Sequence, residues 1–340
     1  MAPSLTEFRD HYRDLLLRFL WRQWSALGVA GHAKTEDQWS VDPDALLVFT
    51  ATVARHDARL FDEVLDWLRT NGNFINVQRL RRILKTEGFA GGRVLAAIAT
   101  ATGQGAEALK WKGLAEAAEP FEQPESLFVL PDYQPLPVLG TPDERFARHG
   151  LLRDVPNLRG YSQEFRPNEK CTLALQLRAL FGVNARSEIL QYLLSHQSAH
   201  PAEIARQTCY FQKTVQDALV DMHRSGVVEV RTSGREKRYW VQSSAWAALL
   251  NRRDESQLPY WVAWPALFRV LERIWLKLQE PAFLAAEPLM AAAELRRLLP
   301  EIRPAIERAE LPANMILSRR QYAGEEYVDV FLEELGMIVR

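Results

Sequence analysis

The chain has 340 residues, of which 47% are hydrophobic and 25% charged, a composition typical of a soluble globular protein with two or three domains. Its formal net charge of −1 excludes a polycation that binds nucleic acid over its whole surface, so any such site has to be a local basic patch. Only two cysteines occur, Cys171 and Cys209, and no apolar run approaches the ~20 residues that span a bilayer. Since a signal-peptide core is also missing, we expect a cytoplasmic protein without a membrane segment.

Residues 1–118 are expected to form an N-terminal helical domain. Apolar residues at helical spacing predict helices over 5–27, 45–54, 58–70, 77–85, 93–102 and 106–118. Asp42-Pro43-Asp44 is typical of a helix start, and Asn76 is predicted to cap the fourth helix. The segment LFDEVLDWLRTNGNFINVQRLRRIL resembles a helix-turn-helix in its order. Because no third helix and hairpin stand beside it, a helical bundle is favoured.

Residues 119–170 are rich in proline. Eight of the 18 prolines of the chain lie in this segment, and proline at that density excludes long helices. The segment also holds apolar residues such as Phe128, Val129 and Leu130. We interpret it as an extended arm that lies along other domains, with a disordered linker as the alternative.

The middle of the chain is predicted to form three consecutive helices. The first is the apolar run ARSEILQYLLSH. The second begins at Pro201, because proline suits a first helical turn and Glu203 suits the positive end of a helix. The third, FQKTVQDALVDMHRS, places Val215, Leu219 and Met222 on one face.

A β-ribbon is predicted after these helices, where Gly226 is typical of a helix end. VVEVR and KRYWV alternate as strands around the turn Thr232-Ser233-Gly234. Three helices followed by a hairpin with a basic tip are the order of a winged helix-turn-helix, which we assign to residues 171–245. In such a unit the third helix enters the DNA major groove and the hairpin, or wing, touches the backbone.

Residues 246–340 are expected to form a C-terminal helical region. Helices are predicted for AWAALL, for LPYWVAWPALFRVLERIWLKL, and for residues 291–299 and 325–340. Aromatic residues at helical spacing favour a core or an interface over a small-molecule pocket, and they are Trp240, Trp246, Trp261, Trp264 and Trp275. The predicted fold class is mainly α, with a winged helix-turn-helix flanked by N- and C-terminal helical regions.

Two sets of residues are candidates for contact with DNA. The exposed start of the third helix offers side chains that can reach base edges: Gln212, Lys213, Thr214 and Gln216. The wing offers cations for the phosphate backbone: Arg231, Arg235, Lys237 and Arg238. Asp217 and Asp221 would repel phosphate and limit how deeply the end of the helix enters the groove. The alternative is that the polar helix face is simply solvated.

This segment resembles the winged helix of ArsR-like transcriptional regulators. The resemblance rests on Ile204-Ala205, Thr214-Val215, Leu219, Met222, Gly226-Val227-Val228, the basic wing and Tyr239. It implies a DNA-binding fold and a lead-in helix, CTLALQLRALFG, that helps to build a dimer. Cys209 stands where the family has a glycine in the turn, and a non-glycine residue there is expected to be strained or to remodel the turn. The cysteine-rich metal box of the metal-sensing members is missing.

Motifs of catalysis and metal binding are not found in the sequence. It holds no HExxH, no paired histidine or cysteine ligands, no GxSxG and no Ser/His/Asp pattern. We therefore expect neither an enzyme nor a protein that needs a metal or a cofactor.

The expected function is that of a sequence-specific transcriptional regulator that binds double-stranded DNA as a homodimer. The flanking helical regions would dimerise the protein and receive its signal. Two alternatives stay open. One is an antitoxin-type regulator that also binds a partner toxin, such as a nucleotidyltransferase. The other is an adaptor whose winged helix binds protein rather than DNA.

Overall fold

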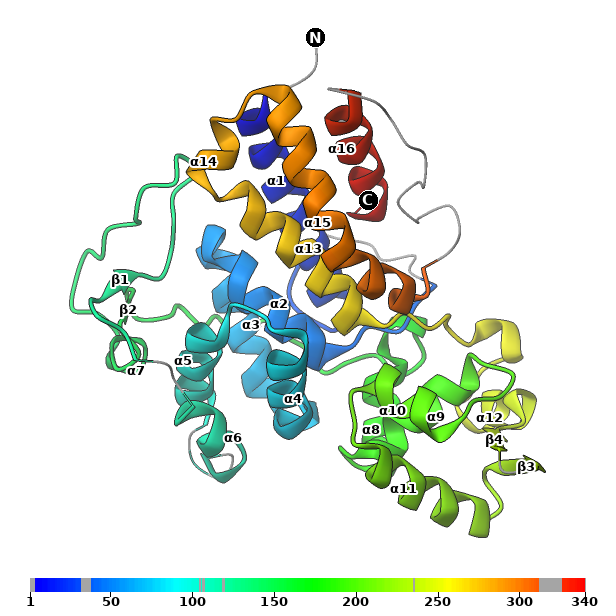
Figure 1. Cartoon of the computed structure of the whole chain (residues 1–340). Helices are drawn as coiled ribbons and strands as arrows, with labels where there is room; N and C mark the ends of the chain where they lie inside the picture. Colours follow the sequence, from blue (N-terminus) through cyan, green and yellow to red (C-terminus); the bar gives the residue numbers. More distant parts are fainter. Residues whose placement is uncertain are drawn as a thin grey trace.

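The computed structural model describes residues 4–31, 38–103, 105, 108–117, 120–234, 236–311 and 326–339. The chain folds mainly into α-helices, with two short two-stranded sheets in this part of it. The helices surround two hydrophobic cores, a large one and a smaller one formed between residues 173 and 258. We call the two units the large body and the small body; Figure 1 shows the small body at the lower right.

Six helices of the large body come from the N-terminal part of the chain. They are α1 (Leu5–Ala26), α2 (Pro43–Val53), α3 (Ala58–Asn71), α4 (Val77–Glu87), α5 (Gly92–Thr102) and α6 (Ala108–Ala115). Side-chain caps fix where they begin. Asp42 accepts hydrogen bonds from two backbone N–H groups at the start of α2, and Asn76 accepts one at the start of α4. The helices lie where the spacing of apolar residues predicts them.

C-terminal helices complete the same core. They are α13 (Trp264–Leu278), α14 (Pro281–Leu284), α15 (Pro288–Ala309) and α16 (Glu326–Val339). Phe268 of α13 stacks on Phe49 of α2 at 4.8 Å between ring centroids, and Tyr12 donates a hydrogen bond to the carbonyl of Leu271 over 3.1 Å. The N-terminal helices and the helices after residue 261, which the sequence predicts to lie in separate regions, therefore share one core. In addition, α15 is longer than expected, because Pro300 and Pro304 lie inside the helix.

The proline-rich segment packs against the large body. It holds β1 (Glu125–Ser126), α7 (Glu144–Ala147) and β2 (Leu151–Leu152), and β1 pairs with β2 in parallel. Leu127, Phe146 and Leu151 are fully buried, and Arg153 forms an ion pair with Asp62 of α3 at 2.6 Å. We call residues 120–169 the arm.

The small body contains α8 (Leu173–Phe181), α9 (Ala185–Leu194), α10 (Pro201–Thr208), α11 (Gln212–Arg224), β3 (Glu229–Ser233), β4 (Glu236–Trp240) and α12 (Ser243–Leu249). Val215 and Leu219 of α11 are fully buried. The strands β3 and β4 form an antiparallel hairpin, and Tyr239 of β4 exchanges two backbone hydrogen bonds of 2.9 Å with Ala199. These bonds hold the base of the hairpin against the start of α10. Among the described residues, none of the helices is long and apolar enough to cross a membrane.

Five buried charged side chains join the two bodies. Arg79 of α4 lies 2.5 Å from Asp42 and 2.9 Å from Asp44, both at the start of α2. Arg178 of α8 lies 2.7 Å from the same Asp44 and 2.6 Å from Glu188 of α9. Burial works against the charged form of Asp42, but the Arg79 and Arg178 guanidinium groups and the Ala45 N–H together outweigh it and lower the pKa of that carboxyl. We call these residues the ionic junction.

Candidate nucleic-acid interface

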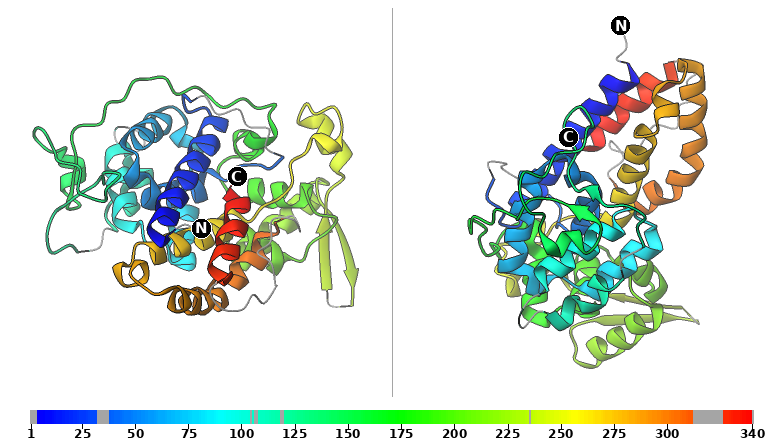
Figure 2. Two further views of the ribbon diagram at one scale, coloured as in Figure 1. Left: turned by 90° about the horizontal axis from the view of Figure 1, so that it is seen from above. Right: turned by 90° about the vertical axis from the view of Figure 1, so that its left-hand side faces the viewer.

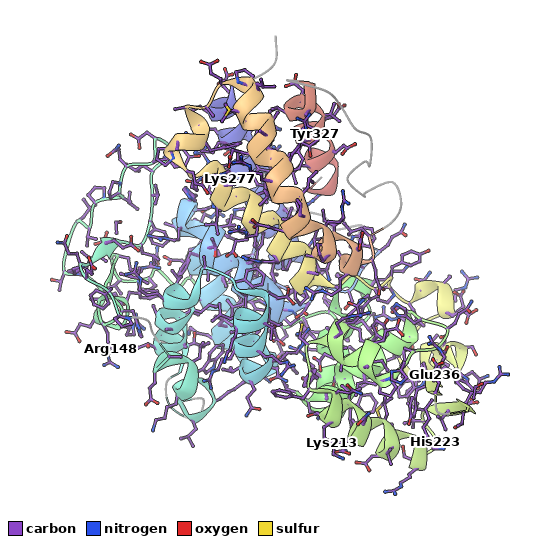
Figure 3. The ribbon with its side chains drawn as sticks, viewed as in Figure 1. Arg148, Lys213, His223, Glu236, Lys277 and Tyr327 are labelled. Carbon is purple, nitrogen blue, oxygen red and sulfur yellow. The ribbon has the colours of Figure 1, made fainter. Side chains whose placement is uncertain are left out.

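The first turns of α11 carry the four residues expected to contact bases. Gln212, Lys213, Thr214 and Gln216 are all exposed, while the apolar face of the same helix lies in the core of the small body. In Figure 3, Lys213 lies near one end of α11 and His223 near the other. The polar side chains are therefore gathered at the N-terminal end of a helix that is anchored along its opposite face.

Acidic residues on α11 are each paired with a cation. Lys213 lies 2.7 Å from Asp217 on the next turn, and Arg186 of α9 lies 3.2 Å from Asp221. Both pairs are solvent-exposed, and exposed pairs contribute less than about 1 kcal/mol to stability. While these pairs are formed, the cations offset the negative charge of Asp217 and Asp221 and reduce the repulsion of phosphate expected from them.

The predicted wing cations lie on both faces of the hairpin. Arg231 and Arg238 are direct cross-strand partners on one face, whereas Lys237 pairs with Thr232 on the other. Arg231 and Lys237 are exposed, and no carboxylate of the described residues forms an ion pair with either. Arg235 lies outside the described residues. Figure 3 marks the hairpin by Glu236.

Arg238 is held against the start of α10 rather than directed into solvent. Its Nε donates to the Ser198 hydroxyl over 3.0 Å and a terminal nitrogen donates to the Ser198 carbonyl over 2.9 Å. Glu236 and Glu203 lie 3.3 Å and 3.7 Å from its guanidinium. Of the predicted backbone contacts, this one fits a structural role at the base of the hairpin better than contact with phosphate.

The turn between α10 and α11 keeps a left-handed residue although it has no glycine there. Cys209 has φ 59° and ψ 40° at the end of α10, which is the strained conformation that the sequence predicts for this position. Burial raises the pKa of its thiol to about 11, so the thiol stays protonated near neutral pH. The large body holds both neighbours, since Arg79 donates to the Thr208 carbonyl over 2.8 Å and Asn76 donates to the Tyr210 hydroxyl over 2.7 Å.

A basic stripe on α4 lies next to α11 and was missed in the sequence. Gln78, Arg81, Arg82 and Lys85 recur at helical spacing along α4. The Arg82 guanidinium lies 3.7 Å from the ring centroid of Phe211, the residue that precedes α11 and is 66% exposed. No described carboxylate forms an ion pair with the three cations of the stripe. The spacing was visible in VQRLRRILK, but its place beside α11 was not.

Two exposed elements, α11 and the hairpin, project from the same end of the molecule (Figure 2). No protein-family model matches the chain, and neither a curated protein nor a solved structure is similar to it. A helix of 13 residues is roughly 20 Å long and narrow enough to enter a major groove about 12 Å wide. Gln212, Lys213 and Thr214 begin that helix. Within the described residues, Arg231 and Lys237 of the hairpin and the three cations of α4 have no carboxylate in an ion pair.

Proposed function

We propose that the protein is a sequence-specific transcriptional regulator that binds double-stranded DNA through a winged helix-turn-helix. The observation that carries the proposal is the arrangement around the start of α11. Two exposed glutamine amides lie there beside Arg82 of the α4 stripe, and the hairpin that carries Arg231 and Lys237 follows the other end of α11 (Figure 3). Amide groups suit contact with base edges, because the pattern of hydrogen-bond donors and acceptors there depends on the base sequence. Cations suit contact with phosphates, which attract them by charge whatever the sequence.

The roles of the residues follow from that division. Gln212 and Gln216 donate to and accept from base edges, most naturally at adenine, and Thr214 adds a hydroxyl. Lys213 contacts guanine or phosphate once its ion pair with Asp217 breaks. On the hairpin, Arg231, Lys237 and the nearby Arg235 bind the backbone, while the α4 stripe binds it near the start of α11.

A homodimer is part of the proposal, because one winged helix makes few base contacts. An exposed apolar patch on α8 and α12 supports it: Leu180 is 55% and Leu249 65% exposed, and Phe181 contacts the Trp246 ring at 5.8 Å between centroids. Covering such a patch favours association of two copies. The patch lies in the small body, so dimerisation there would present two α11 helices to one DNA site.

Selection from a pool of random duplexes tests this function. The purified chain should enrich one motif made of two symmetry-related half-sites, since each α11 reads one half. Gln212→Ala should reduce the base preference of the selected motif at one position of each half-site. Gln257→Ala, which changes an exposed glutamine between α12 and α13, should leave it unchanged. A pool with no enriched sequence after repeated rounds would contradict the proposal.

An antitoxin-type regulator, with a toxin such as a nucleotidyltransferase as its partner, is the second candidate. The arm favours a protein partner because Leu139 and Val155 are 89% and 66% exposed, and Asp154, the neighbour of Val155 in the chain, accepts from the Leu139 N–H. A partner toxin should bind the wild-type protein, and Leu139→Asp should abolish that binding. Unchanged DNA binding by the same variant would separate this role from regulation.

A further inference from the structure

A cavity of about 370 Å³ opens in the large body where α2, α5, α13 and the arm meet. Its apolar wall includes Val94, Val129 and Trp275, and its polar wall includes His56 and Gln279. It is lined by none of the residues that we assign to DNA contact. Clefts with an apolar wall and a few convergent polar groups are the usual form of small-molecule sites.

Two buried polar atoms at this cavity have no hydrogen-bond partner in the described part of the chain. They are Nδ1 of His56 and Nε2 of Gln279. An unsatisfied buried polar group is costly, and such groups in native proteins usually await a partner. Both side chains line this one cavity, although they are far apart in the sequence.

The electrostatics of the cavity favour an anion. Burial, together with the charges of Arg13, Arg55 and Arg9, lowers the pKa of His56 to about 4. Arg55 also lines the cavity; its guanidinium donates to the carbonyls of Leu127 and Ser126 and lies 3.3 Å from Glu125. The carboxylates near these groups have partners, and Glu125 pairs with Arg55 and Arg93. Asp10 accepts hydrogen bonds from Tyr133 and Arg9, and Glu272 accepts them from Thr52 and the Ala90 N–H.

The first turn of α5 adds to this preference. Gly91 and Val94 line the cavity, and Gly91 precedes α5 without a side-chain cap. The positive end of the helix dipole therefore lies beside the cavity, where the Glu272 carboxylate already accepts from the Ala90 N–H. The helix supports the assignment, which rests on the cavity and its two unsatisfied atoms.

We propose that this cavity binds a small organic acid. Its carboxylate lies at His56, Gln279 and Arg55, and its apolar part packs on Val94, Val129 and Trp275. The apolar wall distinguishes an organic acid from inorganic phosphate, which has nothing to place there. This inference goes beyond the proposed function and does not depend on DNA binding.

Benzoate is a suitable probe. Its binding to the full-length protein can be detected by NMR signals of the His56 ring and the Gln279 side-chain amide. Binding in the millimolar range is expected for so small a ligand. Benzamide, the uncharged analogue, should bind at least about tenfold more weakly, and inorganic phosphate should not perturb either signal. Because the bound carboxylate raises the pKa of His56, binding near pH 5 should be accompanied by proton uptake.

Two variants separate binding from folding. Gln279→Leu removes one hydrogen bond and should weaken benzoate severalfold, whereas the exposed control Gln257→Leu should not. Gln279→Glu places a carboxylate inside the cavity, so it should abolish benzoate binding and raise the pKa of His56 in the free protein. The proposal is overturned if benzoate leaves both signals unchanged, if benzamide binds equally well, or if phosphate competes with benzoate.

Discussion

Cys209 shows how one residue ties the turn before α11 to the large body. Its φ of 59° is a conformation that side chains other than glycine adopt at a cost of roughly 1–2 kcal/mol. Its side chain is 7% exposed and belongs to the core of the large body, although its backbone connects two helices of the small body. Packing of the sulfur therefore offsets backbone strain, and glycine would lose that contact.

Substitution of Cys209 tests this balance. Cys209→Ala keeps the backbone strain and loses the buried sulfur, so it should lower the free energy of unfolding by about 1 kcal/mol. Cys209→Val fills the space but is branched at Cβ, which the left-handed region tolerates poorly, and should cost roughly 1–2 kcal/mol more than alanine. Urea unfolding measures both. Equal stability of the valine and wild-type proteins would show that the turn is not strained.

At the scale of elements, the ionic junction fixes the start of α2 against α8 and α9. Replacing Arg178 by methionine leaves Asp44 and Glu188 buried with fewer counter-charges. The free energy of unfolding should fall by about 3–5 kcal/mol, as is usual when one partner of a buried ion pair is removed. Urea denaturation gives the value.

An exposed pair supplies the control for that experiment. Arg186 and Asp221 have side chains that are 48% and 56% exposed. Arg186→Ala should therefore change the free energy of unfolding by less than about 1 kcal/mol. If the two arginine variants are equally stable, the junction does not hold the bodies together.

The elements themselves could be predicted because their signals are local. Asp42 and Asn76 cap the helices that follow them, and Gly226 follows α11 with a φ of 76°. The junction could not be predicted, since Arg178 and Asp44 are 134 residues apart and look like any other charged residues in the sequence. The same holds for the α4 stripe, whose significance depends on the fold placing Arg82 over Phe211. Local patterns indicate helices, whereas partners depend on the whole chain.

The whole molecule combines the two ends of the chain in one core. A chain truncated after residue 260 would lack α13 and uncover the buried rings of Phe49 and Phe19, which contact Phe268. We expect it to lose cooperative thermal unfolding, and co-expression of residues 261–340 should restore it. Circular dichroism melting measures this. Cooperative melting of the truncated chain at the wild-type temperature would show that the N-terminal helices fold alone.

The central claim is that α11 reads bases while the cations beside it bind phosphates. Gln212 carries no charge, whereas Lys237 carries charge on a hairpin, so the two residues should respond differently to salt. Binding of each variant to a selected duplex and to a random duplex, measured over a range of salt concentrations, separates these contributions.

For Lys237→Ala, affinity for both duplexes should fall alike, and the slope of log affinity against log salt should fall by about one unit. For Gln212→Ala, the slope should stay nearly unchanged and binding should lose about 1–3 kcal/mol on the selected duplex only. Arg235→Ala should behave like the lysine variant. If neither Gln212→Ala nor Lys237→Ala alters affinity for any duplex, α11 and the hairpin do not bind DNA, and the surface serves a protein partner instead.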